Sequence, residues 1–95
     1  MKITKEEAQK VLDSIKDIIF ERALNCDEEK ELLVLETTWR EIMIDEWDLA
    51  YIAMDVEKLY DIKLKDDNGW DPSNSIEDTC VSIAKDLKRN NKTIL

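Results

Sequence analysis

The chain has 95 residues, of which 39% are charged and 43% are hydrophobic, so we expect one small globular domain with a single core. A formal net charge of −9 disfavours binding to nucleic acid and to anionic membranes, and favours the basic surface of a protein partner. The acidity could also serve only to keep a small protein in solution. One glycine and one proline are too few for many short strands and turns, which predicts an all-α domain over residues 1–95.

Two cysteines, Cys26 and Cys80, are too few for a disulfide framework, so reduced and partly buried thiols are expected. The chain begins with a charged amphipathic segment and contains no apolar run of membrane length. These features predict a cytoplasmic protein without a secretion signal, an anchor or membrane insertion. Histidine, CxxC pairs and glycine-rich loops are absent from the sequence, so we expect neither an enzyme nor a bound metal or cofactor.

Thr4 and Glu7 fit a capping box, because their side chains can satisfy each other's backbone amides at the start of a helix. The apolar residues that follow have helical spacing and predict a helix over about residues 5–24. They are Ala8, Val11, Leu12, Ile15, Ile18, Ile19 and Ala23. Residues 25–45 then form a long connection. Within it, Leu32–Leu35 is interpreted as a loop segment over the core, followed by one helical turn near residues 37–41.

Asp45 is the predicted N-cap of the second helix, with Glu46 and Asp48 in the first turn, where free backbone amides favour negative charge. Two apolar sets share this helix, which predicts that it is the central helix of the bundle. The first set is Leu49, Ile52, Ala53, Val56, Leu59 and Tyr60, and the second is Trp47, Ala50, Tyr51 and Met54.

Residues 65–74 break the helical pattern and could hold at most a short helical turn. Ser75 and Asp78 then fit a further capping box, which predicts the start of a last helix. Its expected apolar face consists of Ile76, Cys80, Ile83, Ala84 and Leu87. The result is a small bundle of three long helices with an irregular link before the last one.

Two motifs of the chain match a known family in order and spacing. They are Asp45-Glu46-Trp47-Asp48-Leu49 at the start of the second helix and Tyr60-Asp61-Ile62-Lys63-Leu64 at its end. From about residue 32 to residue 87 the chain resembles the acyl carrier proteins and their peptidyl and D-alanyl relatives. The resemblance implies an acidic four-helix bundle with a long loop after the first helix and a short or irregular third helix.

Glu46 stands where that family has the serine that carries phosphopantetheine, and a carboxylate cannot form the same phosphodiester. The glycine that commonly precedes the motif is Met43, the usual leucine after the serine is Trp47, and the proline often found after the helix is Lys65. The resemblance therefore implies the fold of a carrier without its covalent chemistry. Glu46 is either a helix-capping acid or a fixed negative charge near the place of a carrier's phosphate.

Asp13-Ser14-Ile15 has a similar residue order but lies inside the first helix, where Ser14 is interpreted as an ordinary helix residue. Trp47 is either a core residue or an exposed anchor for a partner, since tryptophan is common in both settings. Trp39 and Trp70 fall in predicted connections and are interpreted as lids over the core.

We therefore expect a non-catalytic protein-interaction module or degenerate carrier linked to fatty-acid, polyketide or related biosynthesis. Its second helix would dock on the basic surface of a protein partner such as a biosynthetic enzyme. The expected partner-binding residues are Asp45, Glu46, Trp47, Asp48, Tyr51, Met54, Asp55 and Glu57. Tyr51 and Met54 could instead belong to the core, as helical apolar stripes often do.

Two other functions remain open from the sequence. Small acidic helical domains of this length also resemble bacteriocin immunity proteins, which inhibit a basic nuclease through acidic helix surfaces. A helical bundle could also bind a free lipid non-covalently, although no residue pattern indicates this. Copurification of a biosynthetic enzyme or of a toxin nuclease would distinguish the first two functions.

Overall fold

The computed structural model describes residues 2–23, 31, 33–65 and 68–94, and the regular elements within these ranges are all helical. They are α1 (Lys5–Ala23), the 3-10 turn η2 (Arg40–Ile42), α2 (Glu46–Tyr60) and α3 (Ile76–Arg89). The predicted small helical bundle is confirmed. No fourth α-helix occurs in the described ranges, and residues 62–65 and 68–75 between α2 and α3 are irregular. Cys26 and Leu32 lie outside the described residues.

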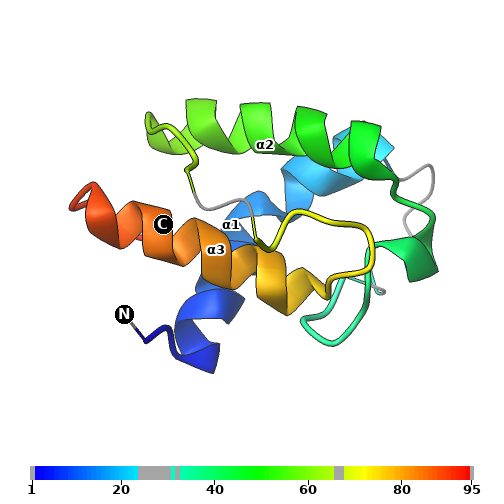
Figure 1. Cartoon of the computed structure of the whole chain (residues 1–95), viewed down its shortest axis with the longest axis horizontal. Helices are drawn as coiled ribbons and strands as arrows, with labels where there is room; N and C mark the ends of the chain where they lie inside the picture. Colours follow the sequence, from blue (N-terminus) through cyan, green and yellow to red (C-terminus); the bar gives the residue numbers. More distant parts are fainter. Residues whose placement is uncertain (1, 24–30, 32, 66–67, 95) are drawn as a thin grey trace.

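The helix α1 packs against both α3 and α2, whereas α2 and α3 contact each other much less (Figure 1). The central helix is therefore α1, and the prediction that α2 is central was wrong. Only one face of α2 is buried, through Leu49, Ile52, Val56 and Tyr60. Leu59, a member of the first apolar set that a central helix would bury, is 41% exposed. A helix at the edge of a bundle buries a single face, and so the second apolar set of α2 remains in solvent.

Each α-helix starts at a capping box, as predicted for the first and last helices, and at the predicted N-cap Asp45 the box is completed by Asp48. The three pairs are Thr4–Glu7, Asp45–Asp48 and Ser75–Asp78. In each pair the first side chain accepts the amide three residues later, and the later carboxylate accepts the first residue's own amide. Two backbone amides that a helix leaves unpaired are thereby satisfied at every start.

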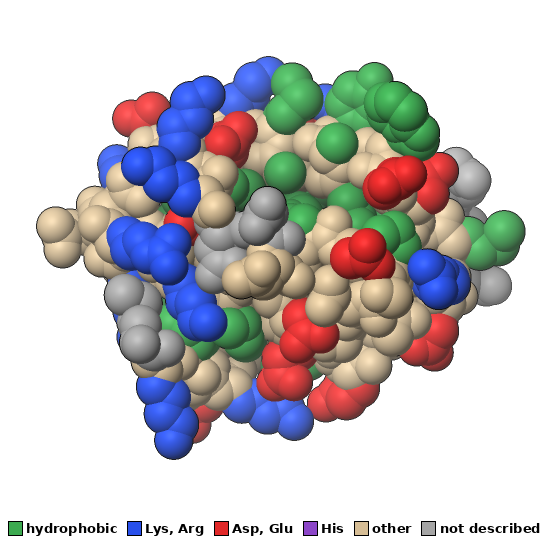
Figure 2. Space-filling view, in the orientation of Figure 1, with side chains coloured by type: hydrophobic (Ala, Val, Ile, Leu, Met, Phe, Trp, Pro, Cys, Tyr) green, Lys and Arg blue, Asp and Glu red, His purple; other side chains and the backbone are tan. Residues whose placement is uncertain are grey.

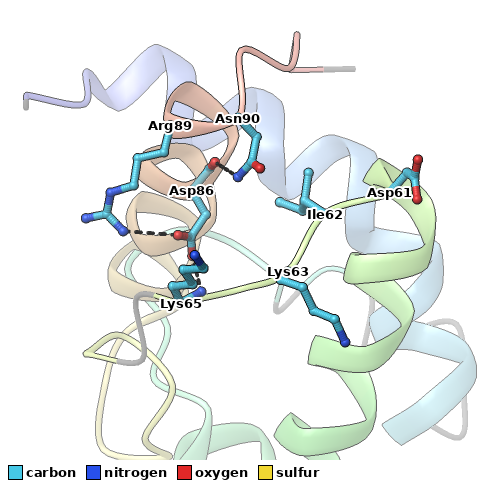
Figure 3. A pocket seen from close by; sticks show the side chains of 7 residues that line it. All are labelled: Asp61, Ile62, Lys63, Lys65, Asp86, Arg89 and Asn90. Carbon is cyan, nitrogen blue, oxygen red and sulfur yellow. Dashed lines mark hydrogen bonds and ion pairs between the residues drawn. The ribbon is translucent and has the colours of Figure 1, made fainter.

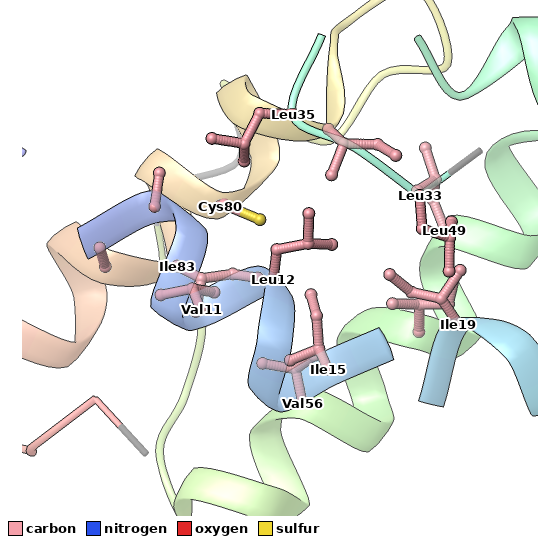
Figure 4. Close-up of a cluster of buried hydrophobic side chains, with 14 of the residues drawn as sticks. Val11, Leu12, Ile15, Ile19, Leu33, Leu35, Leu49, Val56, Cys80 and Ile83 are labelled. Atoms are coloured by element: carbon pink, nitrogen blue, oxygen red, sulfur yellow. The ribbon is translucent and has the colours of Figure 1, made fainter. Parts of the chain in front are cut away.

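The apolar faces of α1 and α3 are buried as their spacing predicted. In α3 the buried apolar residues are Ile76, Cys80, Ile83, Ala84 and Leu87. In α1 they are Ala8, Val11, Leu12, Ile15 and Ile19, with Ile18 only partly buried. Leu33 and Leu35 of the first connection join this cluster between the helices (Figure 4). The loop segment was therefore correctly expected over the core.

The connection before α2 and the connection before α3 run beside each other. Ile76 N donates to Thr37 O at 2.8 Å, and Arg40 N donates to Pro72 O at 3.0 Å. An isolated antiparallel bridge joins Thr38 and Ser75. These backbone bonds hold η2, which lies close to the turn predicted near residues 37–41.

Trp39 is completely buried below these connections, so it is a core residue and not a lid. Its Nε1 donates to Thr79 Oγ1 at 2.7 Å, and the Thr79 hydroxyl donates to the Gly69 carbonyl. A Cβ on Gly69 would collide with the Asp78 carbonyl oxygen and approach Ser82 Oγ to 2.6 Å. Glycine is therefore required where the second connection touches α3.

Both ends of the described chain lie at the same end of the longest axis of the molecule (Figure 1). The first turn of α2 lies at the opposite end of this axis. Within the described ranges, no helix is both long and apolar enough to cross a membrane.

The one-sided burial of α2 can be tested by two truncations. Ile52→Ala should reduce the free energy of unfolding by about 2–4 kcal/mol, because it removes a completely buried side chain from a packed core. Leu59→Ala, on the same helix, should reduce it by less than about 1 kcal/mol. Urea denaturation of both variants measures these values. Equal losses would contradict the burial of only one face.

The close approach at residue 69 gives a second test. Gly69→Ala should reduce the free energy of unfolding by about 1–3 kcal/mol, because the added methyl group displaces the connection from α3. Lys63→Ala, at an exposed residue of the same connection, is the control and should be nearly neutral. Thermal and urea denaturation would detect the difference, and a neutral Gly69→Ala would show that the connection can move away without cost.

Candidate functional site

The solvent side of α2 carries a row of apolar side chains opposite its buried face. Trp47 is 72% exposed, Tyr51 is 50% exposed and Met54 is 52% exposed. Their spacing along the helix places them on one side, with the exposed Ala50 among them. Met43, just before the cap of α2, is 90% exposed. We call these five residues the α2 apolar surface, and Figure 2 shows hydrophobic side chains gathered along this side of the molecule.

Met43 has a backbone conformation that residues other than glycine rarely adopt. Its φ of 61° and ψ of 31° are left-handed, and its amide donates to Arg40 O at 3.0 Å to end η2. A side chain in this region costs about 1 kcal/mol relative to glycine. The exposed Met43 side chain gains little packing in return. This is the position at which the resemblance to carrier proteins expects glycine.

The acids predicted to face a partner are mostly bonded within the domain. Asp45 and Asp48 form the capping box of α2, and Glu57 Oε2 accepts the Leu64 amide at 2.8 Å. Glu46 is exposed and has no hydrogen bond or ion pair with any described residue. Of the acids on α2, Glu46 is thus the one whose charge is free for an external group within the described part of the chain.

Asp55 ties α2 to the end of α1. Arg22 Nε and Nη2 donate to its two carboxylate oxygens at 2.6 and 3.1 Å, and the Arg22 guanidinium lies 5.4 Å from the centre of the Tyr51 ring. The hydrogen bonds from Arg22 lower the pKa of Asp55 and outweigh the partial burial that would raise it. Any stability from this pair is therefore present at neutral pH and lost only as the pH falls through the lowered pKa.

Two shallow depressions meet at Glu46 beside the α2 apolar surface. One has a volume of about 310 Å³ and is lined by Glu46, Leu49, Ala50, Ala53, Glu57, Leu64 and Trp70. The other has a volume of about 510 Å³ and is lined by Arg40, Met43, Ile44, Asp45, Glu46, Asp71 and Pro72. Trp70 is partly buried, and its Nε1 has no hydrogen-bond partner among the described residues. Trp70 therefore covers the edge of the core, as expected from its place in a connection.

A pocket of about 480 Å³ lies at the other end of the molecule (Figure 3). Its buried Asp86 accepts the Lys65 amide and Arg89 Nη1, each at 3.1 Å. The side chains of Lys63 and Arg89 point away from each other (Figure 3). Because the cations do not converge, this pocket is a weaker candidate than the surface of α2.

The described residues offer no arrangement of side chains typical of a metal or nucleophile site. No group of three or more Cys, Asp or Glu side chains among them could hold a metal ion. Burial raises the pKa of Cys80 to about 12, so its thiol stays protonated and unreactive near neutral pH.

The structure places Trp47, Tyr51 and Met54 together outside the core, which excludes the interpretation that they are core residues. Their role in binding a partner stays a prediction. The sequence analysis did not include Met43 in this surface. The presence of methionine where the resemblance expects glycine could have indicated that the side chain has a role. Asp55 was also treated as a partner-binding acid, whereas the described structure bonds it to Arg22.

No family model matches the chain, and no curated protein and no solved structure matches it significantly either.

Proposed function

We propose that the chain is a carrier-like protein-interaction module that has lost its prosthetic group and docks on a protein partner through the α2 apolar surface and Glu46. The observation that carries this proposal is the row of Trp47, Tyr51 and Met54 in solvent, opposite a complete core. A contiguous apolar patch on a small protein marks an interaction site more often than chance exposure does. Tryptophan and methionine are also enriched in protein interfaces.

Local geometry supports the carrier-like part of the proposal. Asp45 is the N-cap of α2, and Glu46 lies exposed in the first turn, where a modified serine would be accessible to an enzyme. Asp61 ends α2 in a left-handed conformation, directly before the buried Ile62. Met43 is left-handed at the position of the expected glycine. The two motifs of the resemblance therefore coincide with the two ends of α2.

The covalent chemistry of a carrier has no counterpart at this position. A carboxylate at Glu46 cannot accept phosphopantetheine through a phosphodiester. Ser14, in the other motif of similar order, is partly buried within α1 and bonds to Val11 O and Tyr60 Oη at 2.7 and 2.5 Å. We therefore propose a non-catalytic role, with an enzyme of fatty-acid, polyketide or related biosynthesis as the partner.

An acidic inhibitor that resembles bacteriocin immunity proteins is supported less well. Such a protein needs unpaired carboxylates toward a basic nuclease, whereas most acids of α2 are bonded within the domain. Charge reversal at Asp48 or Asp55 would consequently disturb the helix cap or the contact with Arg22, and would not report on docking alone. Among the acids of α2, Glu46 is the position at which charge can be changed without breaking an internal bond of the described structure.

The loss of the carrier function can be tested directly by mass spectrometry. Incubation with coenzyme A and a phosphopantetheinyl transferase of broad specificity should leave the mass unchanged, because no serine follows Asp45. A carrier domain with the intact motif serves as the positive control in the same tube. A gain of one phosphopantetheine on any residue would overturn the proposed loss.

Docking through α2 can be tested by affinity capture from the source cells with the intact chain as bait. Trp47→Ala should weaken binding of the captured enzyme at least about tenfold, mainly through faster dissociation, if the ring is an anchor. Glu46→Gln should weaken it severalfold and reduce its dependence on salt. Val34→Ala removes an apolar side chain that is 44% exposed in the first connection, and should have no effect. Capture of a nuclease would favour the inhibitor instead.

A further inference from the structure

We infer, on the basis of the proposed function, that the partner segment is an amphipathic, basic α-helix that lies along α2 and contacts Met43. Three independent features of the surface support this occupant. They are its shape, the charges beside it and the backbone conformation of Met43.

The shape of the surface suits a helix. Trp47, Tyr51 and Met54 form a ridge, and the small side chains of Ala50 and Ala53 lie in the depression beside it. Small residues next to a ridge let a second helix approach closely and insert its own ridge. From Trp47 to Met54 the row extends about 10 Å, at 1.5 Å of rise per residue, which corresponds to two turns of a partner helix. The partner would contribute apolar residues at i, i+3 or i+4, and i+7.

The charges around the two depressions favour a basic partner, whereas on the other side of the surface Arg22 lies over the Tyr51 ring and is paired with Asp55. The two depressions are lined by the carboxylates of Asp45, Glu46, Glu57 and Asp71, and by one cation, Arg40. A helix with lysine or arginine beside its apolar face would complement these acids. A second copy would bring the same acids and a further formal charge of −9 to the contact. An anionic membrane is disfavoured for the same reason.

Met43 extends the apolar surface beyond the first turn of α2. Its left-handed backbone would be relieved by glycine, yet its side chain is 90% exposed and supports no core contact of comparable size. The fold uses the left-handed turn at Met43 but not the methionine side chain, and such locally strained residues are typical of functional surfaces. We therefore expect that replacing the Met43 side chain by hydrogen raises the stability of the domain but weakens its binding to the partner.

Synthetic peptides test the occupant with the full chain. The first peptide places leucines at i, i+3, i+4 and i+7 among lysines, the second has the same composition in a scrambled register, and the third replaces lysine by glutamate. We expect the first to bind at least tenfold more tightly than the second and the third not to bind. NMR titration of the labelled protein should place the shifted amides along α2. Equal binding of the first two peptides, or shifts away from α2, would overturn the inference.

Variants test the role of Met43 in the same titration. Met43→Gly should raise the urea midpoint and weaken binding of the first peptide severalfold, whereas Met43→Leu should keep the binding. Leu59→Ala is the matched control, because Leu59 is an exposed apolar residue of α2 outside the surface. Equal weakening by Leu59→Ala would contradict a specific contact.

The two proposals can fail separately. If no peptide binds but a cellular partner is lost on Trp47→Ala, the helical occupant is wrong and the proposed function stands. If the first peptide binds along α2 but the affinity of the cellular partner is unchanged by Trp47→Ala, the proposed docking mode is wrong.

Discussion

The position of α2 depends on the hydrogen bonds of one buried tryptophan. Trp39 donates to Thr79 on α3, and Thr79 donates to Gly69 in the other connection, so three parts of the chain meet at one point. The backbone bonds between residues 35–40 and 72–77 reinforce this junction. The chain leaves it through η2 and the left-handed Met43, which determine where α2 begins. Apart from Met43, the residues that orient the apolar surface are thus not part of it.

The local features of this fold were predictable and its arrangement was not. Capping boxes such as Ser75–Asp78 depend on residues within one helical turn, so the sequence indicates the start of each helix directly. The burial of α2 depends instead on which helices lie next to it. Apolar residues occur around most of its circumference, and periodicity alone could not show that Trp47 faces solvent while Ile52 faces the core. Trp39 was misjudged for the related reason that a connection can pass through the core.

At the candidate site, the number of acidic residues in the sequence overstates the negative charge that α2 leaves unpaired for a partner. The many acids of the sequence predicted an electrostatic docking surface, and the residues were named correctly as members of α2. The bonds of these acids could not be predicted, because they depend on how the chain folds. Asp55 bonds to Arg22 of another helix, and Glu57 bonds to the Leu64 amide in the connection after α2. Among the acids of α2 in the described structure, Glu46 is the one left unpaired, beside the apolar area. Specificity would then come from the shape of the apolar area together with the negative charge beside it.

The placement of both chain ends at one end of the molecule has a consequence for tethering. Anything joined to either end would leave the molecule on the side away from the first turn of α2 (Figure 1). A linker could therefore attach the domain to a larger assembly while its apolar surface still points outward. A domain tethered in this way meets its partner at a high effective concentration. A contact of small area and low intrinsic affinity would then be occupied most of the time.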